Sequence, residues 1–387
     1  MPVLNSVAEF RATAAEWRRH LHQNPELDFG VHETAAFVVE RLRDFGVDEI
    51  EFGIARTGVV ALIRGRLGDG PVIGLRADMD ALPIHEATGK AWASRIDGRM
   101  HACGHDGHTV MLLGAARHLA ETRNFRGAVA LIFQPAEEGA GGGRAMVEDG
   151  FMERFGITEV YGMHNMPGID VGSFGICDGP IMAALDEFDI LVTGKGGHAG
   201  LPHQAIDPII ISAQILLGLQ TIVSRGTDPL QSLVITATKI HAGEAYNIIP
   251  TTCEIAGTVR TLIPALRDFA ETRIEAVAQS IAECYGARAE LRYRRHDPVT
   301  VNSPAGTRRA LAAAANVVGA DKVNAQVRPV MASEDFAFML EARPGAFIFL
   351  GNGPSAALHN PAYDFDDDAL PVGISYWVSL VETALAE

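Results

Sequence analysis

The chain has 387 residues, and its 48 Asp and Glu residues outnumber its 32 Lys and Arg residues, for a formal net charge of -16. This length favours one large domain or two ordinary ones. The acidic balance argues against partners that select basic surfaces, so we expect no binding to nucleic acid or membrane. No stretch reads as long and apolar enough to span a bilayer. Residues 1–26 form an amphipathic segment without the apolar core of a secretory signal, and we expect a cytoplasmic protein.

Short apolar runs recur along the first half of the chain and again near its end. They cover residues 59–63, 72–75, 128–133, 160–163 and 346–350. Continuous runs of this kind are typical of strands that are buried on both faces. Ligand-type polar residues follow the last four runs. Because open α/β sheets bind ligands at the C-terminal ends of their strands, we expect these residues to converge on one crevice.

The middle of the chain has a different rhythm. The pattern predicts strands at 188–193, 233–238, 253–260 and 287–293, and helices at 208–223 and 264–285. This β-α-β-β-α-β order predicts a ferredoxin-like α+β unit with its helices on one face of an antiparallel sheet. We therefore predict an inserted domain over residues 184–296. The remaining segments, 1–183 and 297–387, form a discontinuous α/β domain whose mostly parallel-core sheet is flanked by helices.

Residues 101–108 place one thiol, three imidazoles and one carboxylate within eight positions. A thiolate and neutral imidazoles are ligands for zinc and its first-row neighbours. In an extended segment, Cys103 and His105 would point the same way, and they could share one ion or bridge two. The alternative is a polar turn before the helical pattern that starts at Thr109.

Two adjacent acids, Glu137 and Glu138, follow the predicted strand at 128–133. One can ligate a metal while the other accepts a proton from water, unless both simply lie in an exposed loop. The glycines at 141–143 do not form a phosphate loop, because no lysine follows at the required spacing. His164 and His359 are each ambiguous alone, but with Cys103, His105 and one glutamate they would supply ligands for two ions.

The predicted inserted domain carries its own polar candidates. His198 lies in a glycine-rich loop, where it could donate to an oxyanion or could be only a turn residue. Asn247 and Arg260 lie near strands of the same domain, and Arg260 could pair with a substrate carboxylate. A further acidic cluster, Ser333-Glu334-Asp335-Phe336, is more simply explained by Ser333 capping the helix that follows it.

These motifs together resemble the M20 metallopeptidase and amidohydrolase family, in its branch of hippurate hydrolases, N-acyl amino acid amidohydrolases and auxin-conjugate hydrolases. The resemblance covers nearly the whole chain. Its motifs lie at residues 18–27, 78–83, 101–108, 134–139, 196–200, 247–250, 333–336 and 358–360. It implies a zinc-exopeptidase-like catalytic domain with an inserted lid or dimerisation domain. The peptidases of the family carry a histidine where Asp78 stands here, which favours the amidohydrolase branch.

The resemblance also implies roles for individual residues. It assigns two divalent metal ions, zinc or manganese with cobalt or nickel as further options, to a set of five ligands: Cys103, His105, Glu138, His164 and His359. Glu137 would be the general base, Asp80 would orient the site from behind the ligands, and His198 would stabilise the oxyanion. Asn247 and Arg260 would hold the substrate. In relatives that dimerise, the lid histidine can come from the partner subunit.

The resulting hypothesis is metal-dependent hydrolysis of the amide bond of N-acyl amino acids, with hippurate-like or N-acetyl substrates. The alternative within enzymes is a di- or aminopeptidase that acts on short peptides. A third reading is a metal-stabilised binding protein, although a spare acid beside the ligands argues against a closed structural site. We expect a small-molecule substrate, and a homodimer or homotetramer is compatible with the inserted domain.

Overall fold

The computed structural model describes residues 5–386, in two compact units. Unit 1 comprises the chain up to Ile181, then Val301–Arg328, and then the segment from Asp335 onward. Unit 2 comprises Met182–Thr300 and Pro329–Glu334. The predicted boundaries at 184 and 296 lie within a few residues of these, but the prediction left residues 329–334 in the first domain. That segment belongs to unit 2 because Ala183 N donates to the carbonyls of Val330 and Ala332, at 3.2 and 2.9 Å.

Unit 1 is built on an eight-stranded sheet in the order β1-β2-β4-β3-β5-β16-β6-β15. The strands are β1 (Glu49–Ile54), β2 (Gly58–Arg64), β3 (Val72–Asp78), β4 (Ala128–Gln134), β5 (Ile157–Met166), β6 (Phe174–Gly175), β15 (Val323–Asn324) and β16 (Gly345–Gly351). The central strands β4, β3, β5 and β16 run parallel, and β4 and β16 are buried throughout. The predicted α/β fold with a mostly parallel core is confirmed.

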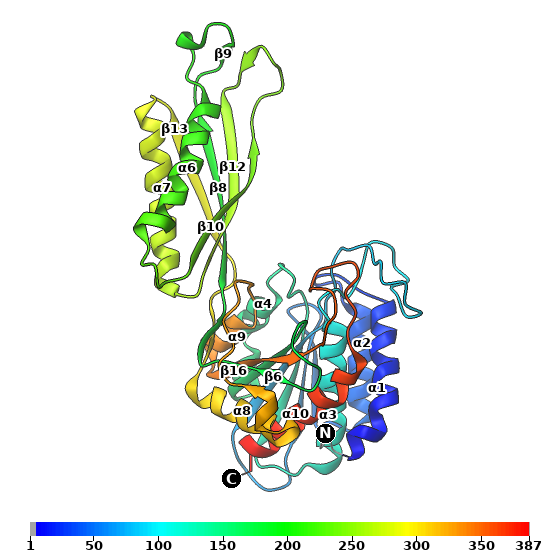
Figure 1. Ribbon diagram of the computed structural model, residues 1–387. Helices are drawn as coiled ribbons and strands as arrows, with labels where there is room; N and C mark the ends of the chain where they lie inside the picture. The colour runs from blue at the N-terminus through cyan, green and yellow to red at the C-terminus, as the bar shows by residue number, and fades with distance from the viewer. Residues whose placement is uncertain (1–4, 387) are drawn as a thin grey trace. The chain divides into compact units, whose positions relative to one another are not determined.

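Helices cover both faces of this sheet (Figure 1). One face carries α1 (Asn5–Gln23), α2 (His32–Asp44), α3 (His105–Thr122), α8 (Pro304–Val318) and α10 (Leu370–Ala384), and the other carries α4 (Gly142–Asp149), α5 (Phe151–Arg154) and α9 (Ala337–Ala342). Short 3-10 turns lie at η2 (Ala320–Lys322) and η3 (Asp367–Ala369). Of the predicted amphipathic segment, residues 1–4 lie outside the described chain. Cover on both faces explains why the central strands are continuously apolar.

Unit 2 has a four-stranded antiparallel sheet in the order β10-β12-β8-β13, with two helices on one face (Figure 1). The elements are β8 (Ala184–Thr193), α6 (Pro208–Gly226), β10 (Leu233–His241), β12 (Thr252–Thr261), α7 (Pro264–Cys284) and β13 (Arg288–Arg295). Smaller elements are β9 (Gly197–His198), η1 (Pro202–Gln204) and β11 (Ile248–Ile249), and β7 (Gly179–Met182) pairs with β14 (Thr300–Asn302) where the chain passes between units. Burial alternates along β8, so Phe188, Ile190 and Val192 face the helices.

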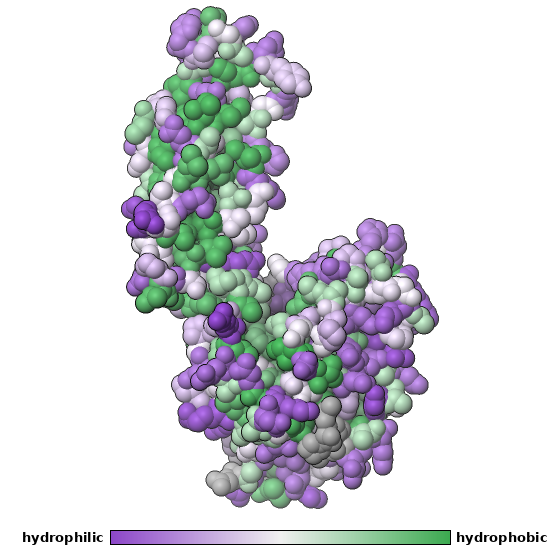
Figure 2. Space-filling view, in the orientation of Figure 1, coloured by the Kyte–Doolittle hydropathy of each residue, from purple (hydrophilic) through white to green (hydrophobic). Residues whose placement is uncertain are grey.

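Helix α6 is unusually apolar on its outer side. Ile210 and Leu217, two turns apart, are 54% and 73% exposed, and Val234 and Ile240 of the edge strand β10 are exposed as well. Figure 2 shows the apolar residues exposed on this unit. By length and composition, α6 is a helix that could cross a membrane, so the prediction that no stretch meets this criterion is wrong. Its inner side nevertheless packs on the sheet through Ile215 and other buried residues, as the core helix of an α+β unit does.

Candidate metal centre

Five predicted ligands come together at the C-terminal edge of the unit 1 sheet. Potential ligand atoms of Cys103, His105 and His164 lie within 4.8 Å of one another, and those of Cys103, Glu138 and His359 do so as well. Cys103 Sγ is 3.3 Å from His164 Nε2, and Glu138 Oε1 is 3.3 Å from His359 Nε2. The shared thiol joins the two groups into one cluster. The predicted convergence of residues from separate strand ends is therefore present in the structure.

The segment that carries Cys103 and His105 was expected to be extended, and this expectation is wrong. Helix α3 begins at His105, and Gly104 precedes it with φ +87°, in the left-handed region. A Cβ atom on Gly104 would lie 2.3 Å from Asn165 Nδ2 and 2.5 Å from Tyr363 Oη. Only glycine fits this conformation in this space. The turn at Gly104 places both ligands on the same cluster by a route that strand periodicity does not describe.

Backbone carbonyls fix the two buried histidine ligands in one tautomer. His105 Nδ1 donates to the Asp80 carbonyl at 2.8 Å, and His164 Nδ1 donates to the Asn165 carbonyl at 2.6 Å. Since a carbonyl can only accept, Nδ1 carries a proton in each ring, and Nε2 is the nitrogen left to face the cluster. Metal-ligating histidines are typically oriented in this way by their second ring nitrogen.

His108 is buried beside the cluster, but its ring nitrogens are not available to ligate a metal ion. Its Nδ1 donates to Asp78 Oδ1 at 2.6 Å, while its Nε2 accepts the backbone N–H of Asn165 at 2.9 Å. Both ring nitrogens are therefore occupied, and no lone pair remains for an ion. Asp78 is itself held by Arg76 Nη1 at 2.8 Å. His108 and Asp78 thus support the cluster from behind.

The electrostatics of the cluster fit a divalent cation. Burial raises the pKa of the Cys103 thiol well above its usual range, and the carboxylates of Glu138, Glu137 and Asp78 raise it further. Burial lowers the pKa of His105, but the carboxylates of Asp78, Asp80 and Glu138 outweigh burial and raise this pKa to about 10. His105 Nε2 lies 3.6 Å from Asp78 Oδ2 and 3.8 Å from Glu138 Oε1, beyond hydrogen-bond distance. A cation would neutralise this excess negative charge and favour the thiolate.

The loop after β4 presents Glu137 and Glu138, and Asp80 holds its backbone. The two Asp80 carboxylate oxygens accept the N–H groups of Glu137 and Glu138, at 2.9 and 3.1 Å. Burial raises the pKa of Asp80, which is fully buried. Atoms of Glu137, Glu138 and His105 lie within 4.8 Å of one another. Asp80 therefore touches the loop and His105, which is the place expected of a residue that orients the site.

His359 comes from the loop after β16 and is the most exposed ligand, with 54% of its side chain accessible. Its backbone has φ +63°, a conformation that non-glycine residues rarely adopt. The His359 N–H donates to the Ala102 carbonyl at 2.8 Å, next to Cys103. Such strained positions cluster at functional sites. The exposed histidine marks the open side of the cluster.

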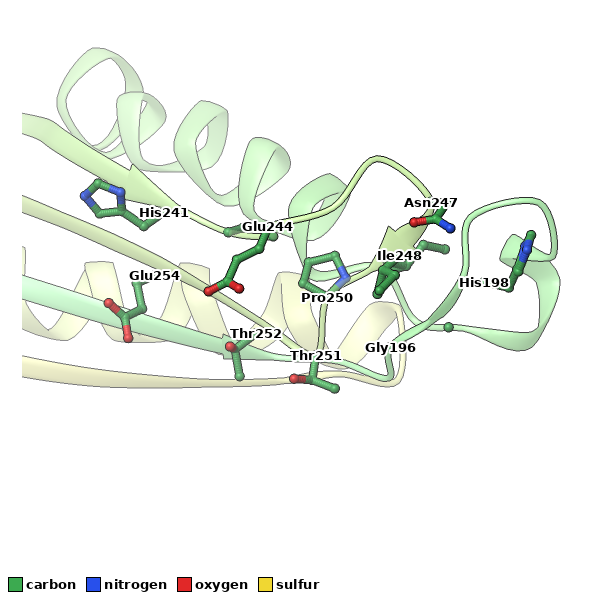
Figure 3. Close-up of a pocket in the computed structure, with 14 residues that line it drawn as sticks. Gly196, His198, His241, Glu244, Asn247, Ile248, Pro250, Thr251, Thr252 and Glu254 are labelled. Atoms are coloured by element: carbon green, nitrogen blue, oxygen red, sulfur yellow. The ribbon is translucent and has the colours of Figure 1, made fainter.

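His198 and Asn247 lie together in unit 2, around a pocket of about 870 Å³ (Figure 3). Ile248, next to Asn247, pairs with His198 between β11 and β9, and Ala199 N donates to the Asn247 carbonyl at 3.1 Å. Both side chains are exposed. The glycine-rich loop thus forms the rim of a pocket rather than an isolated turn.

Arg260 is not brought together with these two residues. It lies near the far end of β12, six residues beyond Glu254 of the pocket, which is about 20 Å at the rise of a strand. Its Nη1 donates to the Met331 carbonyl at 3.0 Å. Arg260 and the pair of His198 and Asn247 therefore cannot hold the same end of one small substrate from a single unit 2.

Sequence reasoning did not assign several residues that support the cluster. Asn165 donates to the Cys103 carbonyl at 2.6 Å and accepts from Tyr363 Oη at 2.7 Å. Arg76 is buried within β3, between Asp78 and Asp335. For Arg76, the available signal was a charged residue directly after an apolar run, which needs a buried partner if the buried strand continues through it.

The fold and the ligand cluster define a metal-dependent hydrolase of the amidohydrolase or peptidase kind. The chain belongs to Peptidase family M20/M25/M40, whose profile matches residues 74–383. It is similar to the N-acetylcysteine deacetylase of Bacillus subtilis (strain 168), with 41% identity over 97% of this chain and 98% of the relative. The hippurate hydrolase of Campylobacter jejuni is 40% identical and covers 98% of both chains. These relatives support the amidohydrolase branch that the motifs indicated.

A solved structure extends the comparison to the whole fold. The YXEP protein of Bacillus subtilis, a dinuclear metal-binding peptidase of the M20 family, matches with a TM-score of 0.86 and 37% identity. The match covers 98% of this chain and 99% of that one. A relative with two metals is consistent with the two ligand groups that meet at Cys103.

Proposed function

We propose that the protein hydrolyses the amide bond of N-acyl amino acids at a dinuclear metal site. The observation that carries the proposal is the convergence of one thiol, three imidazoles and one carboxylate, with a second carboxylate, Glu137, adjacent. The relatives named as an N-acetylcysteine deacetylase and a hippurate hydrolase support this substrate class.

Each residue of the cluster has a defined task in this proposal. Cys103, His105, Glu138, His164 and His359 would hold the ions. Two divalent ions held there would lower the pKa of water and polarise the amide carbonyl. Glu137 accepts a proton from the attacking water and delivers it to the leaving amine, as a general base that becomes a general acid. His198 donates to the oxygen on which negative charge develops.

The test of this mechanism is Glu137→Gln, which keeps the size of the side chain but removes its basicity. We expect kcat to fall by about 10³-fold, within the usual range for a general base, while two metal ions per chain remain by elemental analysis. The control is Glu148→Gln in α4, where the same chemical change falls on an exposed side chain paired with Arg144. Turnover of Glu137→Gln within tenfold of wild type, with metal retained, contradicts the mechanism.

The substrate class is tested with the same preparations. Rates on hippurate and N-acetyl amino acids are compared with rates on dipeptides that have a free amino terminus. The proposal expects higher kcat/KM for the acylated substrates, and the reverse order favours a dipeptidase. The thiolate and imidazoles of the ligand set suit zinc, whereas the carboxylates are ligands that manganese prefers. Reconstitution with each ion, and with cobalt and nickel, ranks the metals by kcat/KM.

We propose further that the protein forms a homodimer through unit 2, in which His198 and Asn247 serve the partner's metal site. Two observations support it: the exposed apolar side chains on α6 and the neighbouring edge strand β10, and the separation of His198 from Arg260 along β12. A two-fold axis would place the same apolar face and the same edge strand of two copies against each other, so that each covers the other.

Mixing two inactive variants tests this arrangement. His198→Ala and Glu137→Gln are unfolded together, refolded and assayed. If His198 acts in the partner's site, half of the dimers are mixed and each has one intact site, so about a quarter of wild-type activity returns. No recovery, or a monomer by sedimentation, overturns the dimer proposal but leaves the hydrolytic mechanism in place.

A further inference from the structure

Two sequence features remain outside the proposed chemistry: the glycines at 141–143 and the acidic cluster at 333–336. The simple explanation of the cluster, helix capping by Ser333, is wrong. Helix α9 begins at Ala337, and Phe336 holds the N-cap position without a side-chain cap. Asp335 points into the protein instead, and it is fully buried. A buried carboxylate requires several donors, which raises the question of what Asp335 binds.

Asp335 accepts hydrogen bonds from side chains and from the backbone. Gln134 Nε2 donates to both carboxylate oxygens, at 2.7 and 2.9 Å, and Arg76 Nη2 donates to Oδ1 at 3.0 Å. The backbone N–H of Gly143 donates to Oδ2 at 2.7 Å. Gln134 is the last residue of β4, and Gly143 lies in the first turn of α4. One carboxylate therefore holds both ends of the loop that presents Glu137.

The loop needs such an anchor because its backbone is strained. Ala136, directly before Glu137, has φ +58° and is fully buried. A non-glycine residue persists in this conformation only when its surroundings impose it. Asp80 holds the middle of the loop through the Glu137 and Glu138 N–H groups. Asp335 supplies the constraint at the ends.

Gly143 is required for the close approach of Asp335. A Cβ atom there would lie 2.7 Å from the Asp335 carbonyl oxygen and 3.0 Å from its Cγ. Backbone at 2.7 Å cannot rotate away as a flexible side chain would, so an alanine would displace the loop. Gly143 of the glycine run and Asp335 of the acidic cluster therefore contact each other directly.

We propose that Asp335 is a positioning residue that sets the place of Glu137 relative to the metal ligands, by holding both ends of loop 134–143. This inference rests on the proposed role of Glu137 as general base. A base must reach its proton within hydrogen-bond distance, and an error of about 1 Å can cost 10²-fold in rate. The hydrogen bonds of Asp335 go to Gln134, Arg76 and Gly143, none of which is a predicted ligand, and a Glu137 carboxylate oxygen lies within 4.8 Å of an Asp335 oxygen. Its effect is therefore expected on the base rather than on metal binding.

The test combines two variants that disturb the contact in different ways. Asp335→Asn places an amide N–H₂ among the Gln134, Arg76 and Gly143 donors, which need an acceptor. Gly143→Ala keeps the Asp335 charge but moves the loop. For both, we expect kcat to fall by about 10- to 100-fold, with KM within about twofold and two metal ions retained. In the double variant the losses are not multiplied, because both changes break one contact. If both variants lose kcat to a similar extent, the loss comes from a displaced Glu137 loop and not from removal of the Asp335 charge.

The control is Asp186→Asn, which removes an equally buried carboxylate of unit 2, bound by Arg267 and Tyr293. It should lower the thermal unfolding temperature but leave kcat within about twofold of wild type. If Asp335→Asn does not fold, Gly143→Ala carries the test with the native carboxylate. Wild-type kcat in Gly143→Ala, or loss of metal in step with kcat, overturns the inference. Glu137→Gln is assayed in parallel. If Glu137→Gln keeps its turnover, the proposed function fails. If Glu137→Gln is inactive and Gly143→Ala is fully active, only the inference that Asp335 positions Glu137 fails.

Discussion

Gly104 separates two metal ligands, and its replacement by alanine is a direct test of the local geometry. In Gly104→Ala, the new Cβ would lie 2.3 Å from Asn165 Nδ2 and 2.5 Å from Tyr363 Oη. Both of these side chains are fully buried and cannot swing into solvent. If Asn165 moves, it loses its hydrogen bonds to the Cys103 carbonyl and to His108.

The magnitude follows from three contributions. A left-handed backbone costs an L-residue about 1–2 kcal/mol. Overpacking in a closed site costs about 1–3 kcal/mol. Each displaced hydrogen bond costs about 1 kcal/mol. With two Asn165 hydrogen bonds displaced, we therefore expect Gly104→Ala to lower the free energy of unfolding by about 4–7 kcal/mol. Because the bonds that orient the ligands are disturbed, metal binding should weaken by about 10- to 100-fold.

The matched control is Gly150→Ala. Gly150 has φ +82° and ψ 22°, almost the same as the φ +87° and ψ 19° of Gly104, but a Cβ atom there meets no heavy atom within 4 Å. It pays the backbone cost of about 1–2 kcal/mol and nothing more. Urea unfolding of the metal-free proteins and metal titration in a competing chelator measure both quantities. Equal stability and equal metal affinity in the two variants would refute the argument that Gly104 is needed for close approach.

Three further outcomes follow from the same structure. Burial lowers the pKa of His22, but the buried Asp106 carboxylate outweighs burial and raises the pKa to about 9. The stabilisation from protonated His22 is complete below pH 6.5 and is lost as pH rises through 9. In urea unfolding, the stability advantage of wild type over His22→Gln should therefore shrink by about 3 kcal/mol across that window. A pH-independent difference would contradict it. Ser303 caps α8 by accepting Gly306 N at 3.1 Å, so Ser303→Ala should cost about 1 kcal/mol of unfolding free energy without changing kcat. Removal of divalent ions by a chelator should abolish hydrolysis, and two equivalents per chain, not one, should restore it fully.

Most of the fold could be predicted from periodicity. The runs at 72–75 and 128–133 are continuously apolar because β3 and β4 are covered on both faces, and the inserted unit alternates because β8 is covered on one. What periodicity could not supply was the short segment at 329–334, which joins unit 2 through hydrogen bonds to Ala183. A segment of six residues has no period to read, and only its backbone partners assign it to a unit.

The ligand types could be named from the sequence, but not the geometry that orients them. The pattern around Cys103 and His105 suggested an extended segment, whereas the left-handed Gly104 turns the chain directly into α3. The tautomers of His105 and His164 depend on backbone carbonyls that have no signature in sequence. The five ligands, the role of Glu137 and the substrate-holding roles of Asn247 and Arg260 stay predictions until the variants are measured, as does the cytoplasmic location.

Three buried aspartates show why a sequence reading underestimates such a site. Asp78 holds His108, Asp80 holds the backbone of Glu137 and Glu138, and Asp335 holds the ends of their loop. None of them is proposed to ligate metal, and each is costly to bury. Their cost is offset because every one receives N–H donors from the elements that carry the ligands and the base. Rigidity at the reacting centre is therefore built from carboxylates one layer behind it, and a hydrolase of this kind should lose kcat when that layer is altered, even with its metal site intact.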